Sequence, residues 1–427
     1  GAGPTAALNA VHAARSDRPE LQRVHSRHGR RQVAAAATVL FLATGCSSAE
    51  VVPETSTPAV QVQADSPTEI TVWVSEAQAL GLEVVAAQFL MDTGTRVNLV
   101  VKENLQPDFL GAGPGTGPDI ILGSYDWQPE LVAAGKLEPI DVSGLAEGFI
   151  PGAIQAFAYQ GQQYGLPVSQ ENAALACVLE AMPTAPETFQ EAVAAGLAIS
   201  LNDGAGDPYH FYALQTSFGA PVFETAEDGS YLTVLGMGTE AGVAFAAWLS
   251  DNATSFELAS NTRNIKEQLV AGTKACWLTG PWNGNWFNEQ FGESGWAAYP
   301  VPPAGPYPGS TFSGATGAMV ASGSDAVATA TKFVLEYLGS SQGQLALFQG
   351  TGKAPAELAA LEQSSASKIA YEFGMAGLES VPMPVIAEMD SIWVPWAAAQ
   401  VGIIRGDDEP AVIWQKMLDE INASLGY

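Results

Sequence analysis

Basic side chains are scarce in this chain. It has 17 lysines and arginines against 45 aspartates and glutamates, so its formal net charge is −28. Six of the arginines lie within the first 45 residues, which leaves the remainder more acidic still. An acidic surface repels nucleic acid and anionic lipid, so neither is expected as a partner.

Histidines, cysteines and long apolar runs are also few. Only one histidine, His210, follows the N-terminal 45 residues, and no CxxC or Cys/His cluster is present, so we predict neither a metal nor a cofactor. The lone histidine provides no Ser-His-Asp arrangement. The apolar run at residues 33–43 is too short to cross ~30 Å of hydrocarbon as a helix.

The composition otherwise describes an ordinary folded protein. Hydrophobic residues make up 47% of the 427 residues, a content typical of globular chains and not of disordered ones. A chain of this length exceeds what one hydrophobic core usually serves, so two domains are expected.

The N-terminal region has the features of an export leader. Arg27, Arg30 and Arg31 precede the apolar run, which leads into small residues and then Cys46. Two interpretations stay open: a lipoprotein leader in which Cys46 is lipidated, or ordinary secretion with an incidental cysteine. We predict a leader over residues 1–45 and a flexible tether rich in Ser, Thr, Pro and Glu over 46–67.

The other two cysteines, Cys177 and Cys276, lie in apolar runs typical of strands. An exported protein meets an oxidising environment, in which the two could form a disulfide. They could equally be buried thiols, because sequence does not give the Cα–Cα distance that a disulfide needs.

Strand and helix patterns alternate after the tether. Residues 70–74, 96–101 and 118–122 are predicted strands, and apolar residues at helical spacing fill the interval from 82 to 90, before Gly94. Further helices are expected at 189–198, 240–249, 326–338 and 413–425. This alternation predicts an α/β fold with largely parallel sheets.

The block AGTKACWLTGPWNGNW, residues 271–286, combines aromatic and amide side chains after a Gly-Pro turn. Aromatic faces stack on the apolar C–H faces of sugars, and amides bond to sugar hydroxyls. The block therefore indicates carbohydrate binding.

Five blocks, taken in order over residues 68–427, resemble the extracytoplasmic solute-binding proteins of ABC importers (family 1), specifically the maltose/maltodextrin-binding type. They are ITVWVSEAQALGLEVVAAQF; GPDIILGSYDWQPELVAAGKLEPI; QGQQYGLPVSQENAALACVLEAMPTAPETFQEA; GDPYHFYALQTSFGAPVFE; and EQLVAGTKACWLTGPW with MPVIAEMDSIWVPWAAAQVGII.

The resemblance implies a two-lobe periplasmic-binding-protein-like fold of type II, with discontinuous lobes joined by hinge strands. The N-lobe is expected to comprise residues 68–170 plus 311–342, and the C-lobe 171–310 plus 343–427. Crossings between lobes are expected near Gln170–Glu171, Gly309–Ser313 and Ser341–Gly343. Ligand would bind in the cleft and select a closed state by contacting both lobes.

The resemblance also implies a set of ligand contacts. Asp126 follows a predicted strand at the edge where cleft loops of parallel sheets lie, and its carboxylate could accept hydrogen bonds from hydroxyls. Trp396 is interpreted as either a ligand contact or a core residue, and His210 as a scaffold residue. The full predicted set is Glu76, Gln78, Asp126, Trp127, Glu171, Asp207, Tyr209, Trp282, Trp393 and Trp396.

Several of these positions depart from the family pattern. Trp127 stands where an arginine is typical, Gly123 where a cleft tryptophan is typical, and Val394 where tyrosine is common. Glu76 and Gln78 occupy positions where the family uses Asp and Lys. These departures weaken maltose as the ligand but leave a neutral oligosaccharide in place.

The expected function is therefore capture of a neutral oligosaccharide by a monomer that delivers it to a membrane permease and its ATPase. The protein is expected to be exported and either lipid-anchored through Cys46 at the outer face of the cell membrane or periplasmic. A secreted glycosidase using Glu171 and Asp207 is the alternative enzyme. Binding of a polyol, amino sugar or peptide is the alternative within the binding class, whereas a phosphate ligand would need basic cleft residues that the candidate positions do not offer.

Overall fold

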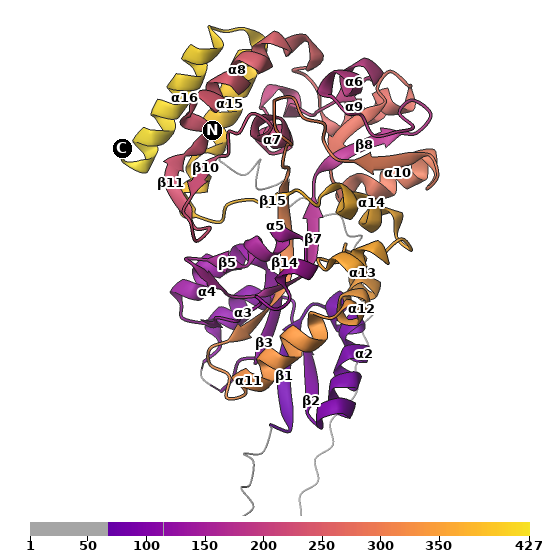
Figure 1. The fold of residues 1–427 in the computed structure, drawn as a ribbon, viewed down its shortest axis with the longest axis vertical. Coiled ribbons are helices and arrows are strands. Elements are labelled where there is room, and N and C mark those ends of the chain that lie inside the picture. Colours follow the sequence, from indigo (N-terminus) through magenta and orange to yellow (C-terminus); the bar gives the residue numbers. More distant parts are fainter. Residues whose placement is uncertain (1–66, 114) are drawn as a thin grey trace, which may run out of the picture.

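The computed structural model describes residues 67–113 and 115–427. The predicted leader, Cys46 and the tether up to residue 66 lie outside the described residues. Two lobes stack along the long axis of the molecule, with strands β7, β14 and β15 between them (Figure 1). The expected two-lobe α/β architecture is confirmed.

The first lobe is built on a sheet of order β15-β14-β3-β1-β2, to which β4 and β7 also pair through β14. Its elements are β1 (Glu69–Val74), α2 (Glu76–Thr93), β2 (Arg96–Val101), α3 (Leu105–Gly111), β3 (Ile120–Ser124), α4 (Gln128–Ala133), β4 (Leu137–Glu138), α5 (Pro151–Ala156), β5 (Ala158–Tyr159), β6 (Gln162–Gln163), β7 (Leu166–Asn172), β14 (Phe312–Ala321), α11 (Val327–Lys332), α12 (Ser341–Thr351) and α13 (Leu358–Glu362).

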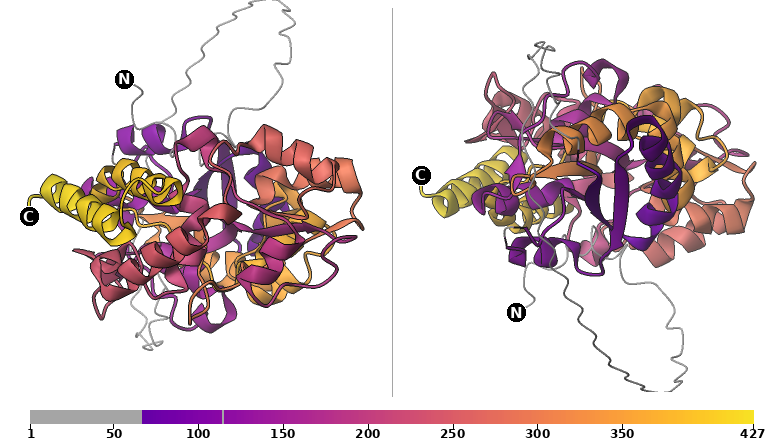
Figure 2. Two further views of the ribbon diagram at one scale, coloured as in Figure 1. Left: turned by 90° about the horizontal axis from the view of Figure 1, so that it is seen from above. Right: turned by 90° about the horizontal axis from the view of Figure 1, so that it is seen from below.

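The second lobe contains a smaller sheet of order β13-β8-β12-β9. Its elements are β8 (Ala174–Val178), α6 (Phe189–Ala195), β9 (Leu197–Ala198), α7 (Pro208–Thr216), β10 (Phe223–Thr225), β11 (Tyr231–Leu235), α8 (Glu240–Asp251), α9 (Thr262–Val270), β12 (Cys276–Thr279), α10 (Gly284–Phe291), β13 (Trp296–Tyr299), α14 (Lys368–Ala376), β15 (Val381–Pro382, shared with the first sheet), α15 (Trp393–Arg405) and α16 (Pro410–Leu425). The helices α15 and α16 pack together at one edge of the molecule (Figure 2).

The opening of the fold follows from local sequence signals. Ile70, Val72 and Val74 are buried on β1, and Ser75 starts α2 through a capping box with Gln78. Gly94 ends α2 at φ 77°, a left-handed conformation that glycine adopts without steric cost. The predicted strands and the helix between them are therefore confirmed.

Two expectations about secondary structure are wrong. The sheets are mixed and not largely parallel: in the first sheet β14 runs antiparallel to β3, β4 and β7, and in the second sheet β8 runs antiparallel to β12 and β13. The helix expected at 189–198 ends at Ala195, and Leu197–Ala198 form strand β9. Gly196, at φ 99°, ends the helix, and the strand then pairs with β12.

The first two expected crossings coincide with the strands between the lobes. β7 continues through Ala173 into β8 of the second sheet, and β14 begins at Phe312 and pairs with β7. The chain therefore passes between the lobes along two adjacent antiparallel strands, as expected for hinge strands.

We propose that the third crossing lies later in the chain than Ser341–Gly343. α12 packs along α2, and its Leu347 and Phe348 belong to the first-lobe core. The chain leaves that lobe through α14, whose Ala370 packs in the first-lobe core and whose Phe373 packs against the second sheet. This crossing would move the lobe boundary from residue 342 into α14, residues 368–376.

Cys177 and Cys276 form a disulfide, which decides between the two alternatives left open by the sequence. The residues are direct partners on the antiparallel strands β8 and β12, with Cα atoms 4.0 Å apart, and both are fully buried. The bond joins two strands of the second sheet across 99 residues of sequence.

Among residues 67–113 and 115–427, every helix is too short or too polar to reach across a lipid bilayer.

Candidate functional site

Aromatic side chains from several elements gather where the two lobes meet. Tyr209, near the start of α7, lies 6.5 Å from Trp282 and 5.7 Å from Phe312 between ring centroids. Phe312 begins the hinge strand β14, and Trp393 lies 6.2 Å from it. We call Tyr209, Trp282, Phe312 and Trp393 the aromatic cluster. Three of its members were predicted from the sequence, and Phe312 was not.

Trp282 is the most accessible member of this cluster, with 40% of its surface exposed. It lies on the short 3-10 turn Pro281–Asn283 that follows β12, and its indole ring lies over Gly280. A Cβ atom at position 280 would overlap the indole, so glycine is required for this ring position. The side chain of Asn283 donates to Thr279 Oγ1 at 3.0 Å and stabilises the turn instead of facing solvent.

Replacing Gly280 by alanine is expected to lower affinity for the ligand about tenfold, because the added methyl displaces the indole of Trp282. The matched control is Gly148→Ala, since a Cβ there has no neighbour within 4 Å and the backbone is not left-handed. Ligand titration followed by tryptophan fluorescence measures both variants. Equal affinity for Gly280→Ala and the unmodified protein would contradict this account.

Asp207 caps α7 and pairs with His210. Its carboxylate accepts from the backbone N–H of His210, and its Oδ2 lies 2.7 Å from His210 Nδ1. The other ring nitrogen of His210, Nε2, is buried without a partner, and its imidazole lies edge-on to Trp282 at 6.0 Å. The predicted scaffold role of His210 agrees with its position beside Trp282. Both carboxylate oxygens of Asp207 are bonded to His210 at the start of α7.

Glu171 lies on the hinge strand β7 opposite Gly314 of β14, and therefore on the same face of the two strands as Phe312. Its carboxylate contributes, with burial and Asp207, to raising the pKa of the Tyr209 phenol. Its Oε2 lies 2.5 Å from the Nζ of Lys353, and both side chains remain more than 40% exposed. Lys353 was not predicted from the sequence, because it lies 182 residues further along the chain and no local pattern connects it to Glu171.

Asp126 and Trp127 lie in the 3-10 turn that follows β3 in the first lobe. Asp126 is exposed and adjoins Tyr125. Burial raises the pKa of the Tyr125 phenol, and Asp126 and Tyr209 add to this increase. The indole of Trp127 lies over Gly123 and packs with the apolar cluster on the face of the sheet that α3 and α4 cover. The absence of a side chain at Gly123 therefore makes room for the ring of Trp127.

Glu76 and Gln78 begin helix α2. Glu76 is exposed, but the side-chain oxygen of Gln78 accepts from the backbone N–H of Ser75 at 2.8 Å. Gln78 is almost fully buried, so its main role in the structure is to cap the helix.

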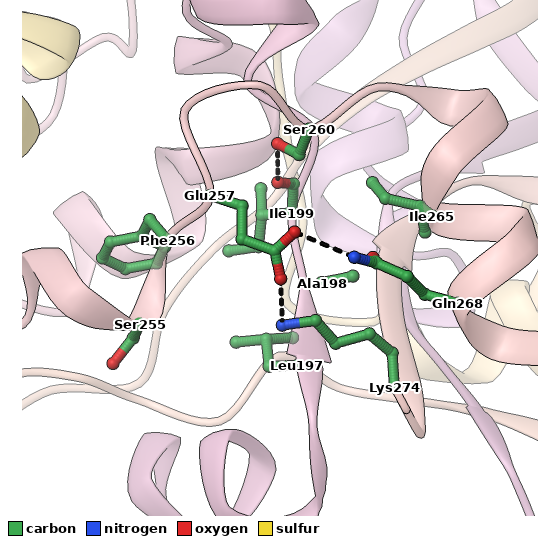
Figure 3. A pocket seen from close by; sticks show the side chains of 10 residues that line it. All are labelled: Leu197, Ala198, Ile199, Ser255, Phe256, Glu257, Ser260, Ile265, Gln268 and Lys274. Carbon is green, nitrogen blue, oxygen red and sulfur yellow. Dashed lines mark hydrogen bonds and ion pairs between the residues drawn. The ribbon is translucent and has the colours of Figure 1, made fainter. Parts of the chain in front are cut away.

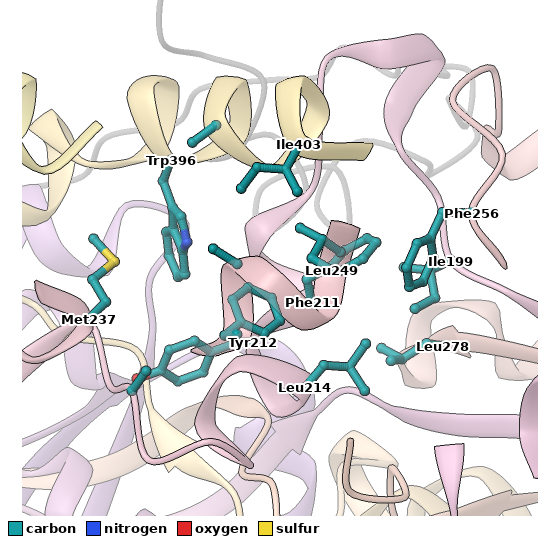
Figure 4. Packing of buried hydrophobic residues seen from close by; sticks show 14 of the residues in the cluster. Ile199, Phe211, Tyr212, Leu214, Met237, Leu249, Phe256, Leu278, Trp396 and Ile403 are labelled. Carbon is teal, nitrogen blue, oxygen red and sulfur yellow. The ribbon is translucent and has the colours of Figure 1, made fainter. Parts of the chain in front are cut away.

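Trp396 is a core residue, the second of the two alternatives left open by the sequence. It is fully buried, and its indole N–H donates to Gln215 Oε1 at 2.9 Å. Figure 4 shows it packed among second-lobe residues that include Tyr212 and Met237. Trp393, one helical turn earlier, stacks on it at 5.6 Å and is only half-buried.

Two tyrosines, one from each lobe, hold the segment that follows β15. Tyr125 of the first lobe donates to the carbonyl of Met383 at 3.1 Å, and Tyr231 of the second donates to that of Pro382 at 3.3 Å. Burial raises the pKa of Tyr125, and that of Tyr231 to about 12. Burial likewise raises the pKa of Tyr209 and of Tyr212, which stacks on Phe312.

Because burial raises the pKa values of these four tyrosines, we predict that the fold loses stability in alkali. A phenol whose folded-state pKa exceeds its unfolded value of about 10 stabilises the fold fully below pH 10. That contribution falls as pH rises from about 10 through 12 and beyond. A tyrosinate absorbance titration is expected to show a late fraction that ionises together with loss of circular dichroism. Complete ionisation near pH 10 with the fold intact would contradict the prediction.

A small pocket in the second lobe is too small for a ligand. It surrounds Glu257, which is bonded to Lys274 and Gln268 (Figure 3), and its volume of about 10 Å³ is at the lower limit for one water.

A larger open groove of about 420 Å³ lies beside β1 and α3 in the first lobe, where the Nζ of Lys102 lies 4.2 Å from the centre of the Trp73 ring. Within the described residues, no three His, Cys, Asp or Glu side chains converge as metal ligands.

The site is suited to binding by stacking and hydrogen bonding. Glu171 and Asp207, the two carboxylates considered for hydrolysis, are each engaged by a basic partner. The fold and the site together define a two-lobed binding protein with aromatic residues at the junction of its lobes.

The comparisons with known proteins agree with that class. Residues 84–371 match the family described as bacterial extracellular solute-binding protein, and the chain belongs to this family. It is 25% identical to the maltodextrin-binding protein MdxE of Bacillus subtilis, over 83% of this chain and 88% of that protein. It is also 25% identical to the galactooligosaccharide-binding protein of the same organism, over 80% and 86% of the two chains.

Solved structures share the fold. A cyclo/maltodextrin-binding protein in complex with maltotetraose superposes with a TM-score of 0.73 at 23% identity, covering 85% of this chain and 98% of that one. An extracellular solute-binding protein of Staphylococcus aureus in complex with maltose gives a TM-score of 0.71 at 22% identity, over 85% and 99%.

Proposed function

We propose that this protein binds a neutral oligosaccharide of the maltodextrin type between its lobes and delivers it to an ABC importer. The observation that carries the proposal is the aromatic cluster with the Glu171 carboxylate facing Tyr209 from the hinge. Aromatic rings offer stacking surfaces for sugar C–H faces, and the carboxylate accepts from hydroxyls. The names of the relatives, which specify maltodextrin and galactooligosaccharide, favour the same ligand class.

Several finer features belong to this proposal. Ligand contacts are assigned to Tyr209, Trp282, Trp393 and Glu171, with Asp126 as a contact from the first lobe. The predicted leader and Cys46 support export with a lipid anchor, and the partner is then a permease in the same membrane. Membership in a family of binding proteins supports the assignment of a non-enzymatic role.

Titration of the purified protein with maltose, maltotriose, trehalose, cellobiose and a xylo-oligosaccharide tests the function. Saturable change in tryptophan fluorescence with at least one sugar is expected, because Trp282 and Trp393 lose water on binding. Chromatography of the sugar afterwards should show no hydrolysis product. No fluorescence change with any of the five sugars, together with an unchanged melting temperature, would overturn the oligosaccharide assignment and favour a polyol, amino sugar or peptide.

A further inference from the structure

Lys353 is held beside the hinge by the backbone of its own loop. α12 ends at Thr351 and is capped by Gly352, and the residues that follow Lys353 join β7: the N–H of Gln170 donates to the carbonyl of Ala354 at 3.1 Å. A bridge between Ser169 and Pro355 continues this pairing. The lysine therefore starts from a fixed backbone position, and its side chain reaches Glu171 on the same strand.

The pair formed by Glu171 and Lys353 has little to do with stability. Its Nζ–Oε2 distance is 2.5 Å, yet the side chains are 44% and 43% exposed. Ion pairs with this exposure contribute little to the free energy of folding, because water screens them and ordering two long side chains costs entropy. Glu171 is instead the direct partner of Gly314 on β14, so its side chain lies on the same face of these strands as Phe312 of the aromatic cluster.

Both charged groups keep free hydrogen-bonding capacity. An ammonium has three donors, of which Glu171 takes one, and a carboxylate has about four acceptor positions. An accessible donor and an accessible acceptor therefore lie side by side. Two hydroxyls on adjacent sugar carbons match this arrangement, since one can donate to the carboxylate while the oxygen of the other accepts from the ammonium.

We propose that Lys353 contacts the ligand directly and that the Glu171–Lys353 pair binds a vicinal diol, that is, two hydroxyls on adjacent sugar carbons. This inference rests on the proposed function and narrows it: the ligand presents two adjacent free hydroxyls to the hinge. Lys353 also gives the site a basic group, whereas none of the ligand contacts predicted from the sequence is basic. Sugars that lack either hydroxyl are bound more weakly.

Calorimetric titration with maltotriose tests the proposal on three single variants. Lys353→Met is expected to lower affinity about tenfold or more, and Glu171→Gln by a similar factor, because each removes a charge-assisted hydrogen bond. The matched control is Lys332→Met, which breaks an exposed Lys–Glu pair on α11 and should leave affinity unchanged. In the double variant, the combined loss should be smaller than the product of the single losses, because the two residues act as a unit.

Monodeoxy maltosides separate ligand contact from a structural role. For the deoxy sugar that lacks the hydroxyl held by Lys353, the unmodified protein and Lys353→Met should bind with equal affinity, whereas other deoxy sugars should still distinguish them. An affinity loss of the same factor for every deoxy sugar, or no loss at all with maltotriose, overturns the proposal. If the unmodified protein binds no sugar, the proposed function itself fails and this inference fails with it.

Discussion

Replacing both Cys177 and Cys276 by alanine is expected to lower the free energy of unfolding by about 3–5 kcal/mol. The disulfide closes a loop with a sequence separation of 99, and a loop of about 100 residues loses roughly 4.7 kcal/mol of unfolded-chain entropy when it is cross-linked. Both residues are fully buried between strands of the second sheet, so alanine introduces no new polar group. Urea unfolding of the second lobe, followed by tryptophan fluorescence, measures the loss.

Chemical reduction of the unmodified protein provides the control for the lost side-chain atoms. Under reducing conditions its midpoint should move towards that of the double variant, which should itself be insensitive to the reductant. The count of reactive thiols in the denatured protein should rise by two on reduction. An unchanged midpoint for the double variant would contradict the stabilising role of the bond.

Trp282→Ala is expected to lower ligand affinity about 30- to 150-fold. A large aromatic side chain at the centre of a binding surface typically contributes about 2–3 kcal/mol, and Trp282 is the exposed ring of the aromatic cluster. Removal of the ring should cost only about 1 kcal/mol of stability, since 40% of it already faces water. Ligand titration by calorimetry and a thermal melt of the same sample separate the two effects.

Tyr307→Ala is the matched control for this variant. Tyr307 is a large aromatic residue that is 58% exposed and lies against Gly219, away from the aromatic cluster. The Tyr307→Ala variant should bind the ligand with the same affinity as the unmodified protein. Equal affinity for Trp282→Ala and Tyr307→Ala would show that Trp282 is not a ligand contact.

Local patterns in the sequence predicted much of the fold. The alternation of apolar residues on β1 and β2, and the glycine that ends α2, act within a few residues and are therefore readable without a structure. The Gly-Pro turn before Trp282 is equally local. The site residues Tyr209, Trp282 and Trp393 were identified because their motifs resemble a family, and the structure brings them to one place.

The sequence does not show the contacts of other positions, because those contacts are long-range or depend on packing. The side-chain oxygen of Gln78 caps its own helix, and Trp396 turns inward to Gln215, which lies 181 residues away. Trp393 and Trp396 lie three residues apart on α15 and stack on each other, so they share a face of the helix and differ in how deeply each is buried. The sequence shows both tryptophans but not the depth at which the second lobe covers each ring.

By itself, the sequence determined the main strands and helices apart from β9, the family resemblance and the aromatic content of the site, because these depend on neighbouring residues. The tertiary structure decided that Cys177 meets Cys276, that α12 stays with the first lobe and that Lys353 reaches Glu171. Each of these contacts joins residues far apart in the chain. Such contacts form only when whole strands and helices pack, and no short-range pattern encodes them.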